Sequence, residues 1–511
     1  MKKLIFTFFI LLSAMRITAQ TPGTVDSSFG GTGHVATHIY DLDNIAYAVE
    51  VQTDGKIVVA GSAQNDTLTS FVLIRYNTDG SLDPSFGTGG IAMPYFGNVK
   101  NIAFALAIQS DNKIVVSGYS NSGGNDAFEL VRYNANGTLD ASFGTGGIVN
   151  HPIGLYGGRA FAVAIQQDGK IIQGGFGYYN TSNNFVMVRY NTNGVVDSTF
   201  GVNGVSVSMP GDHEAEINAL KILPGGKIIA VGQSHITTNN DFAVARYKTN
   251  GILDSTFGTN GYTTKDINNN ADMGFATDIQ PDGKIVVAGN TVSGSNWVFA
   301  VMRFNADGTL DTQFGTNGID TLEAGGHGSE AYGVKVQTNG KIVVTGYTTV
   351  FGQYKFSTMR LNTDGTVDTT FGNAGVAVNS ISNDDGAYGM ALQADGKIIV
   401  AGVSKNNTTY YYDVTLFRYF GDITTGLNEL SETCEFSIYP NPAKNNLNIE
   451  VPVNSLQNNI ISIYDIQGRL VIQANLYVGV NTLNIYSLTK GMYVLRLCNN
   501  DMIRISKFIK E

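Results

Sequence analysis

Charged residues and cysteines are scarce in this chain of 511 residues. Only 14% of the residues are Asp, Glu, Lys or Arg, whereas about a quarter is typical of soluble domains. The only two cysteines are Cys434 and Cys498, near the C-terminus, so no disulfide framework holds the first 420 residues together. Whether the two pair depends on a separation that the sequence leaves open. Most of the chain must therefore be held together by packing.

Excess positive charge and long apolar runs are also missing. The net charge of −10 leaves no basic stripe for a phosphate backbone, so we expect no nucleic-acid partner. The apolar run Leu4–Leu12 follows Lys2 and Lys3, and residues 1–20 are predicted to be a secretory signal peptide. That run is too short to span a bilayer, and no later stretch predicts a transmembrane segment.

Catalytic signatures are absent as well. The chain has no Gly-x-Ser-x-Gly elbow, no His-Glu-x-x-His and no phosphate loop. Its six histidines fall at unrelated positions, and lone loop histidines are usually not metal ligands. We therefore predict no catalytic residues and no catalytic metal.

What the chain does have is a repeat of constant length. An Asp-x-x-Phe-Gly marker returns every 57 residues, and 61 glycines supply the turns. A fixed period of this size indicates stacked supersecondary units. The marker begins at Asp26, Asp83, Asp140, Asp197, Asp254, Asp311 and Asp368.

Each repeat contains four strand-length segments. In the first complete copy these are Tyr47–Gln52, Ile57–Ala63, Phe71–Tyr76 and Ile91–Tyr95. The first two are joined by Asp54-Gly55, a pair that favours a tight hairpin. Four short antiparallel strands in each of several repeats predict the blades of a β-propeller.

The two ends of the repeat region predict that the array closes into a ring. Residues 26–38 supply only a loop and a fourth strand, while residues 388–419 supply only the first three strands. In a ring, the N-terminal strand completes the last blade and removes both free edges. We therefore predict an all-β chain in which residues 21–420 form a seven-bladed propeller of four-stranded blades.

A recurring arginine supports this closure. Each third strand ends in an arginine eight residues before the marker aspartate, which pairs Arg75 with Asp83 and Arg132 with Asp140. The last one, Arg418, has no such partner, and Asp26 at the other end has no arginine. We expect these two to meet across the closure. The alternative is that the charges are solvated loop residues, which contribute little.

The predicted ligand face carries the irregular loops. The hairpins between strands one and two and the loops between strands three and four are nearly uniform, whereas the links between blades and the remaining turns vary. Variable loops on a rigid scaffold are where binding usually occurs. They offer acids and aromatics suited to a carbohydrate or a protein ligand, although solvated loops have the same composition. The candidates are Asp41, Asp43, Asp212, His213, Glu214, Glu216, Trp297, Glu323, His327, Glu330 and Tyr410.

Two further chemistries stay open. Two carboxylates across a central funnel could act on glycosides, although nothing distinguishes one pair. The first candidates would be Asp212, Glu214, Glu216, Glu323 and Glu330. The repeated loop Asn77–Asp83 places side-chain oxygens at alternate positions, as calcium loops do. Other copies replace these acids, and turn chemistry alone explains the residues, so Ca²⁺ is the only cofactor considered.

The repeat cassette resembles a known family. The segments Gln52–Gly61 (Gln-x-Asp-Gly-Lys-Ile-Val-Val-Ala-Gly) and Arg75–Gly87 (Arg-Tyr-Asn-x-x-Gly-x-Leu-Asp-x-x-Phe-Gly) resemble the delta-60 repeat of bacterial secreted proteins. The resemblance implies a propeller-like domain and no assigned activity. Copies depart from the pattern at Asn112, Pro224-Gly225-Gly226 and Leu361, where we expect local irregularity.

A different module follows Phe420. Residues 421–435 are predicted to be a linker, and residues 436–511 alternate apolar and polar residues, which favours a small immunoglobulin-like β-sandwich. Its motifs resemble the C-terminal sorting domain of the type IX (Por) secretion system of Bacteroidetes. The residues that carry the resemblance are Pro440, Asn441, Pro442, Gly468, Gly491, Tyr493, Lys507 and Lys510.

This second resemblance implies recognition by outer-membrane secretion machinery after passage through the periplasm. The product is then secreted or held at the cell surface. A plain carbohydrate-binding or stalk sandwich is the alternative for the module. For the whole chain we predict an exported, non-enzymatic binding scaffold. The competing hypotheses are a secreted glycan-active hydrolase or lyase and a passive surface filler.

Overall fold

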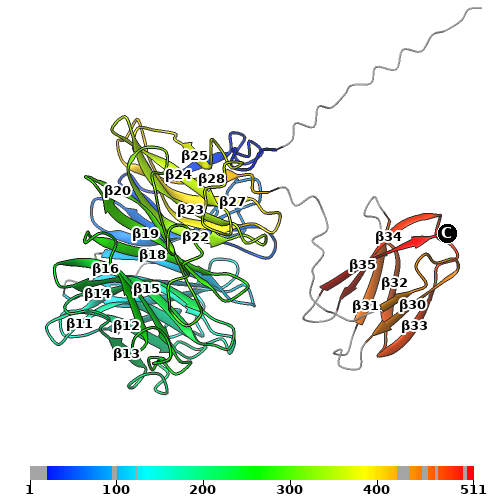
Figure 1. The fold of residues 1–511 in the computed structure, drawn as a ribbon, viewed down its shortest axis with the longest axis horizontal. Helices are drawn as coiled ribbons and strands as arrows, with labels where there is room; N and C mark the ends of the chain where they lie inside the picture. The colour runs from blue at the N-terminus through cyan, green and yellow to red at the C-terminus, as the bar shows by residue number, and fades with distance from the viewer. Residues whose placement is uncertain are drawn as a thin grey trace, which may run out of the picture. The chain divides into compact units, whose positions relative to one another are not determined.

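The structure is a computed structural model that describes residues 20–94, 100–121, 124–422, 437–451, 459–465, 470–498 and 503–511. The chain divides into two compact units, Met1–Thr424 and Thr425–Glu511 (Figure 1). Residues 1–19 of the predicted signal peptide and most of the predicted linker lie outside the described residues. Within these ranges every assigned element is a β-strand, and none forms a helix long and apolar enough to cross a membrane.

Seven four-stranded antiparallel blades make up the described part of the first unit, and a single parallel pairing of Thr69 with Lys100 joins blades 1 and 2 into one eight-stranded sheet. Blade 1 contains β2 (Asn44–Val51), β3 (Ile57–Gln64), β4 (Thr69–Tyr76) and β5 (Ile91–Ala92), and blade 2 contains β6 (Lys100–Ile108), β7 (Ile114–Asn121), β8 (Ala127–Tyr133) and β9 (Ile148–Pro152). Blade 3 contains β10 (Gly158–Ile165), β11 (Ile171–Tyr179), β12 (Ser182–Tyr190) and β13 (Val205–Ser208). Blade 4 contains β14 (Ala215–Ile222), β15 (Ile228–Ile236), β16 (Asn239–Tyr247) and β17 (Tyr262–Lys265). Blades 5 to 7 are formed by β18 (Asp272–Ile279), β19 (Ile285–Ser293), β20 (Asn296–Phe304), β21 (Ile319–Leu322); β22 (His327–Val336), β23 (Ile342–Val350), β24 (Gln353–Leu361), β25 (Val376–Asn379); and β26 (Asp385–Leu392), β27 (Ile398–Lys405), β28 (Tyr412–Tyr419), with β1 (His34–Thr37).

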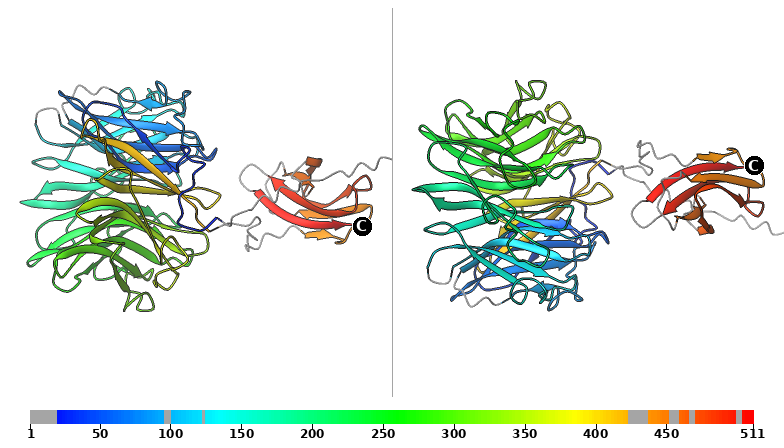
Figure 2. Two further views of the ribbon diagram at one scale, coloured as in Figure 1. Left: turned by 90° about the horizontal axis from the view of Figure 1, so that it is seen from above. Right: turned by 90° about the horizontal axis from the view of Figure 1, so that it is seen from below.

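The last blade is completed by the start of the chain. Its strand order is β1-β28-β27-β26, and His34 to Thr37 pair in register with Phe417 to Val414. The blue N-terminal segment therefore lies beside the yellow to orange strands of the last blade (Figures 1 and 2). This confirms the predicted seven-bladed propeller and its closure by the N-terminal strand.

The shared sequence of the blades follows from how their strands pack. The second strand of a blade is buried on both faces, which explains runs such as Ile57-Val58-Val59-Ala60. The first strand bulges between Ala46 and Ala48, which brings its backbone against the second strand. A Cβ on Gly61 would lie 1.8 Å from the Ile45 carbonyl oxygen, so only glycine fits there.

The irregularity expected at Asn112 is absent, whereas Gly225 adds a second positive φ, of 87°, to its hairpin. Asn112 adopts a positive φ of 63° in the place of the hairpin glycine, and its N–H donates to the Gln109 carbonyl at 2.9 Å. Gly55 and Gly226 make the same bond to Gln52 and Leu223 at the same distance. Asn tolerates the left-handed region better than most residues, so the turn survives without glycine.

The second unit is a small two-sheet sandwich. One sheet contains β29 (Ser437–Tyr439), β30 (Asn446–Val451) and β33 (Gly479–Asn484), and the other has the order β32 (Leu470–Leu476), β31 (Asn459–Tyr464), β34 (Gly491–Cys498), β35 (Ile503–Lys510). Between them lies a core that includes Leu447, Ile461, Leu495 and Phe508.

The Pro-Asn-Pro segment is bonded to the final strand. Asn441 donates through Nδ2 to the Lys507 carbonyl at 3.1 Å and accepts from the Ile509 N–H at 2.9 Å. The Tyr493 hydroxyl donates to the Thr489 carbonyl at 2.9 Å. Gly468, Cys434 and the side chain of Cys498 lie outside the described residues, so the pairing of the cysteines stays open.

Candidate functional site

The first strands of all seven blades line a central channel. Their side chains enclose a cavity of about 560 Å³. Each of these strands, β2, β6, β10, β14, β18, β22 and β26, runs from an interblade link to a uniform hairpin. The channel therefore has one mouth among the variable links and one among the repeated turns.

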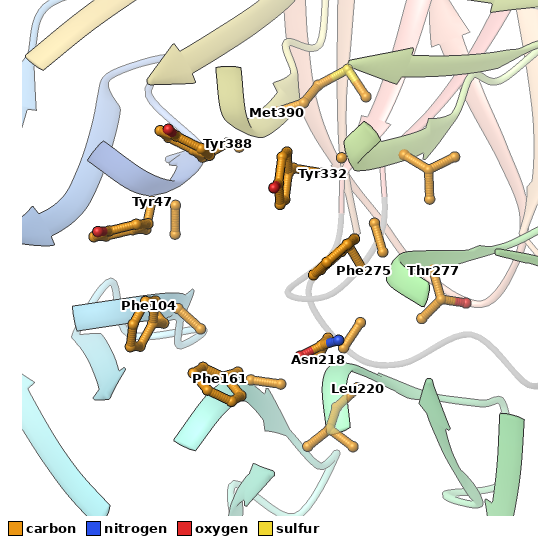
Figure 3. Close-up of a pocket in the computed structure, with 18 of the residues that line it drawn as sticks. Tyr47, Phe104, Phe161, Asn218, Leu220, Phe275, Thr277, Tyr332, Tyr388 and Met390 are labelled. Carbon is orange, nitrogen blue, oxygen red and sulfur yellow. The ribbon is translucent and has the colours of Figure 1, made fainter. Parts of the chain in front are cut away.

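A ring of aromatic side chains surrounds the middle of this channel (Figure 3). Neighbouring rings along the circle have centroids 4.8–5.7 Å apart, a spacing typical of packed aromatic pairs. All are half-buried, so their exposed edges and faces line the cavity. The ring consists of Tyr47, Phe104, Phe161, Phe275, Tyr332 and Tyr388.

Blade 4 interrupts the ring with an amide. Asn218 occupies the equivalent position, and its Nδ2 donates to the Gly274 carbonyl of the next blade at 2.8 Å. Figure 3 shows it between Phe161 and Phe275. The amide leaves one polar opening in an otherwise aromatic wall.

Polar groups from three blades lie toward the variable mouth. Burial raises the pKa of Glu216, the nearby Glu214 adds to the effect, and Arg159 opposes it. Arg159 itself is held by an ion pair of 2.6 Å with Asp126, and its guanidinium stacks over Tyr119 at 4.6 Å. In blade 6, Glu330 accepts a hydrogen bond of 2.6 Å from the Tyr332 hydroxyl.

Two ion pairs cross between blades at the other end of the channel. Lys335 lies 3.3 Å from Glu50, and Lys221 lies 2.7 Å from Asp278. Burial opposes the charge on Lys335, but Glu50 and Asp278 raise its pKa above the ordinary value. The aromatic ring is therefore flanked by charged groups on both sides.

The structure disperses the other residues of the predicted ligand face. Asp43 accepts from the Tyr412 N–H at 3.1 Å, and Asp212 accepts from the Thr237 N–H at 3.2 Å. Of the predicted set only Glu216 lines the channel. The rest are on loops or strand ends, and those that are exposed are Asp41, Asp212, His213, Glu214, Glu323, His327 and Tyr410, while Trp297 and Glu330 are half-buried.

The seven arginines and the marker aspartates form ion pairs in every blade. Their Nε to Oδ2 distances are 2.7–2.8 Å, including Arg418 with Asp26 across the closure. The arginine side chains are 0–9% exposed and the aspartates 3–8%, so these pairs are not solvated loop charges. Each guanidinium also stacks over the marker phenylalanine, as Arg75 does over Phe86 at 4.5 Å.

These arginines also join one blade to the next. Arg132 donates to the Thr192 carbonyl at 2.5 Å and Arg189 to the Thr249 carbonyl at 2.6 Å, each in the following blade. Arg418 makes the same bond to Thr78 of blade 1. The repeated loops are therefore scaffold that fastens the ring.

A lysine completes each pair, and the sequence interpretation missed it. The lysine that follows each hairpin turn between strands one and two lies 2.8–3.3 Å from the aspartate of the pair, for example Lys56 from Asp83 at 2.9 Å. The constant spacing of this lysine was the available signal. Burial alone would raise the pKa of Asp83, but hydrogen bonds from Lys56 and Ser85 hold this pKa well below its usual range.

The loop considered for calcium is explained by turn chemistry. Asp79 Oδ1 accepts from the N–H of Ser81 at 2.9 Å and from its hydroxyl at 2.7 Å, and Asp83 is taken by Arg75 and Lys56. In this loop the carboxylates therefore already have partners.

Opposing pKa shifts predict that stability peaks in mildly acidic solution. The marker aspartates stabilise the fold above the unfolded pKa of about 3.9, and this contribution is lost as pH falls toward their lowered folded values. Burial raises the pKa of Glu129 and of Asp272 to about 7, so both groups cost stability as pH rises from about 4 to 7. Urea midpoints measured without added divalent cations should therefore be highest between about pH 4 and 5.

The control for this pH profile is Glu129→Gln. Glu129 is 1% exposed and accepts from Ser120 Oγ at 2.7 Å and Asn150 Nδ2 at 2.6 Å. The neutral amide cannot ionise, so the loss of stability between pH 5 and 8 should shrink while the acid limb stays. A wild-type midpoint that rises steadily from pH 3 to 8 would contradict the assignment.

Comparison with protein families identifies both units. The DUF5122 β-propeller model, a domain of unknown function, matches residues 52–86, 109–143, 166–200, 223–257, 280–314, 337–371 and 393–414. The secretion system C-terminal sorting domain matches residues 437–511. The chain is a DUF5122 β-propeller protein with a Por secretion sorting domain. The family resemblances seen in the sequence are confirmed.

The sorting domain shows how this DUF5122 propeller protein reaches its destination. It is exported through the type IX secretion system, whose machinery its C-terminal domain engages, and is secreted or held at the cell surface. No curated protein matches the chain.

The similar solved structures are distant. The extracellular domain of a putative hybrid two component system from B. thetaiotaomicron is 11% identical with a TM-score of 0.39, and the match covers 96% of this chain and 58% of that one. The polysaccharide lyase Uly1 is 12% identical with a TM-score of 0.43, covering 73% and 89%. A gluconolactonase from Xanthomonas campestris is 10% identical with a TM-score of 0.36, covering 75% and 100%. We draw no function from these matches.

Proposed function

We propose that this exported propeller is a non-enzymatic binding protein and that its central channel holds a small carbohydrate. The observation that carries the proposal is the half-buried aromatic ring, interrupted by Asn218 and flanked by polar groups. Ligand sites are mostly apolar cavities in which a few placed polar groups fix orientation. Aromatic faces would cover the apolar faces of a sugar, while Asn218 and Glu216 would meet its hydroxyls.

The arrangement of acids favours binding over turnover. Glycoside hydrolysis needs two carboxyl groups about 5–10 Å apart on either side of the scissile bond. Among the residues that line the channel, the acids are Glu216 and Glu50, and Glu50 is paired with Lys335. Glu214, the sequence partner of Glu216, is exposed. The hydrolase or lyase alternative therefore lacks a free second carboxylate in the channel lining.

A glycan array probed with the mature chain, followed by calorimetry on each hit, tests the proposal. Phe275→Ala removes one wall of the ring and should weaken binding roughly thirtyfold, the effect of losing about 2 kcal/mol at a binding hot spot. Asn218→Phe should fill the opening in the ring and also weaken binding. Tyr410→Ala, an exposed loop variant, is the matched control and should bind as wild type does.

Other results would point elsewhere. Equal losses in Phe275→Ala and Tyr410→Ala, or a loss in Tyr410→Ala alone, would move the site to the variable loops. Release of a shortened glycan that disappears in Glu216→Gln would support the hydrolase or lyase alternative. A screen without any hit, under conditions in which the protein is folded, would contradict carbohydrate binding.

A further inference from the structure

A cluster of three carboxylates lies at the junction between blades 4 and 5, away from the channel lining. Asp241 is on the third strand of blade 4, β16, and Asp266 and Asp272 are at the two ends of the link that leads into β18. Each offers one oxygen within 4.8 Å of an oxygen of the other two. Asp241 is 5% exposed and Asp272 is 0% exposed.

The buried oxygens of this cluster lack partners. Asp272 Oδ2 accepts the Ile267 N–H at 2.6 Å, but Oδ1 of Asp272, Asp241 and Asp266 is buried without a hydrogen bond to any described residue. Nor does any described Lys, Arg or His nitrogen form an ion pair with the three. The Thr291 hydroxyl is opposite Asp272 in the β18–β19 ladder and acts to lower the pKa of its carboxyl, but it too is buried without a hydrogen-bond partner among the described residues.

Equivalent junctions show how the fold normally satisfies an acid at these positions. In blade 7, Asp413 occupies the register position of Asp241, and it is paired with His38 Nδ1 at 2.7 Å and Asn406 Nδ2 at 2.8 Å. The residue that faces it at the start of the next blade is the neutral Asn44. That junction therefore holds one acid with a basic partner.

Blade 7 also contains the counterpart of Asp272. Asp385 begins β26, and its Oδ2 accepts the N–H groups of Ile381 at 2.8 Å and Ser382 at 3.1 Å, while its Oδ1 accepts the Ser382 hydroxyl. The position that corresponds to Asp241 there is Lys355, a cation. Among the seven junctions, only that between blades 4 and 5 has an acid at both positions, and a third acid is added in its link.

Three carboxylates this close, of which Asp241 and Asp272 are buried and Asp266 is half-buried, must share protons or take up a cation. Burial and the neighbouring carboxylates raise the pKa of Asp272 to about 7 and of Asp241 to about 6. His235 and Lys265 act to lower the pKa of Asp241 but form no ion pair with it. Above these values the cluster carries excess negative charge in a buried site.

The donor set matches a hard cation. Carboxylate oxygens are the ligands that Ca²⁺ prefers, and the three aspartates supply one each within reach of a single ion. We propose that Asp241, Asp266 and Asp272 bind one calcium ion at the blade 4–5 junction and thereby tie the link to the third strand of blade 4. The ion would stabilise this junction and would not touch the channel ligand.

The mature chain, treated with a chelator and titrated with CaCl₂, tests the site. Calorimetry should show one ion bound per chain with a dissociation constant in the millimolar range or tighter, and calcium should raise the melting temperature. Binding should release protons and weaken as the pH falls from 8 to 5, because the ligands must be deprotonated. Mg²⁺ should bind more weakly, since it keeps its water shell and demands octahedral geometry.

Asp241→Asn is the decisive variant. Asn184 occupies the same position in blade 3, so the fold accepts the amide there. In chelator the variant should be at least as stable as wild type, because one of three crowded charges is gone, while its calcium affinity should fall at least tenfold. Asp385→Asn, at the register position of Asp272 in blade 7, is the matched control and should keep wild-type affinity.

Three outcomes would overturn the site. One is the absence of binding heat and of any melting shift at calcium concentrations on the order of 10 mM, above the range of extracellular modules. Another is wild-type affinity in Asp241→Asn. The third is equal loss of affinity in Asp385→Asn, which would place the ion elsewhere.

Discussion

Replacing Asp26 by Asn is expected to destabilise the propeller by about 3–5 kcal/mol, the usual effect of leaving one partner of a buried ion pair uncompensated. Asp26 is 3% exposed, and its carboxylate lies 2.8 Å from Arg418 and 3.3 Å from Lys397. The amide would leave both cations without their counter-charge. The substitution also acts at the blade in which residues from opposite ends of the chain close the ring.

Urea unfolding of the mature chain at pH 7 measures this effect. Asp66→Asn is the control, because Asp66 is exposed and its replacement should change stability by less than about 0.5 kcal/mol. Asp83→Asn removes the equivalent aspartate within a contiguous blade. It therefore separates what the ion pair contributes to the free energy of unfolding from what ring closure contributes. A loss for Asp26→Asn no greater than that for Asp66→Asn would show that the pair is not structural.

A double variant tests whether the loss of stability comes from Arg418 being left without its counter-charge. Arg418→Gln together with Asp26→Asn removes both charges, so the double variant should be less destabilised than the sum of the single changes. Arg418 also donates to Thr78 of blade 1 and stacks over Phe29 at 4.7 Å. Recovery should therefore be incomplete, and strict additivity would argue against coupling between the two charges.

The fold could be predicted from the sequence because the repeat has a constant length, so that equivalent residues of successive blades can be aligned. Seven markers at one spacing fix the number of blades, and the unmatched Arg418 and Asp26 indicate which ends meet. The replacement of glycine in one hairpin led to a wrong expectation, because the turn depends on the backbone φ at that position and more than one residue type can adopt it. Asn112 takes a φ of 63° and keeps the hairpin that the loss of glycine had seemed to threaten.

The channel was harder to predict, although its signal was in the same period. Tyr47, Phe104 and Phe161 each stand five residues before the hairpin glutamine, in strands that read simply as first strands of a blade. Only the closed ring shows that these strands face one another. Loop variability instead directed attention to exposed residues such as Asp41 and Tyr410, which the structure leaves apart from the channel lining.

The acidic cluster could not be found from the sequence for a different reason. Asp266 and Asp272 are at the two ends of an interblade link, but Asp241 lies in a buried strand of the preceding blade, and nothing in its local pattern marks it. Its proximity depends on how blades 4 and 5 pack. Its lack of partners becomes meaningful only beside the satisfied acids Asp413 and Asp385.

Deleting residues 436–511 is expected to abolish appearance of the protein outside the cell and to leave it in the periplasm. The deleted segment contains the whole sorting domain match, which begins at residue 437, and it belongs to a compact unit of its own. The propeller keeps its seven blades and its closure without that segment, because none of their strands lies in it. The retained protein should therefore be folded and resist proteolysis, as immunoblots of periplasm, surface and medium would show.

Point variants distinguish loss of the sorting signal from the effect of shortening the chain. Asn441→Ala breaks the bonds from the Pro-Asn-Pro segment to Lys507 and Ile509, so it should reduce export, whereas Thr482→Ala alters an exposed bond to Asn448 and should not. Transfer of residues 425–511 to a periplasmic reporter should carry it out of the cell. Normal export of the deleted chain, or failure of the reporter to leave despite being folded, would contradict an address that resides in this domain.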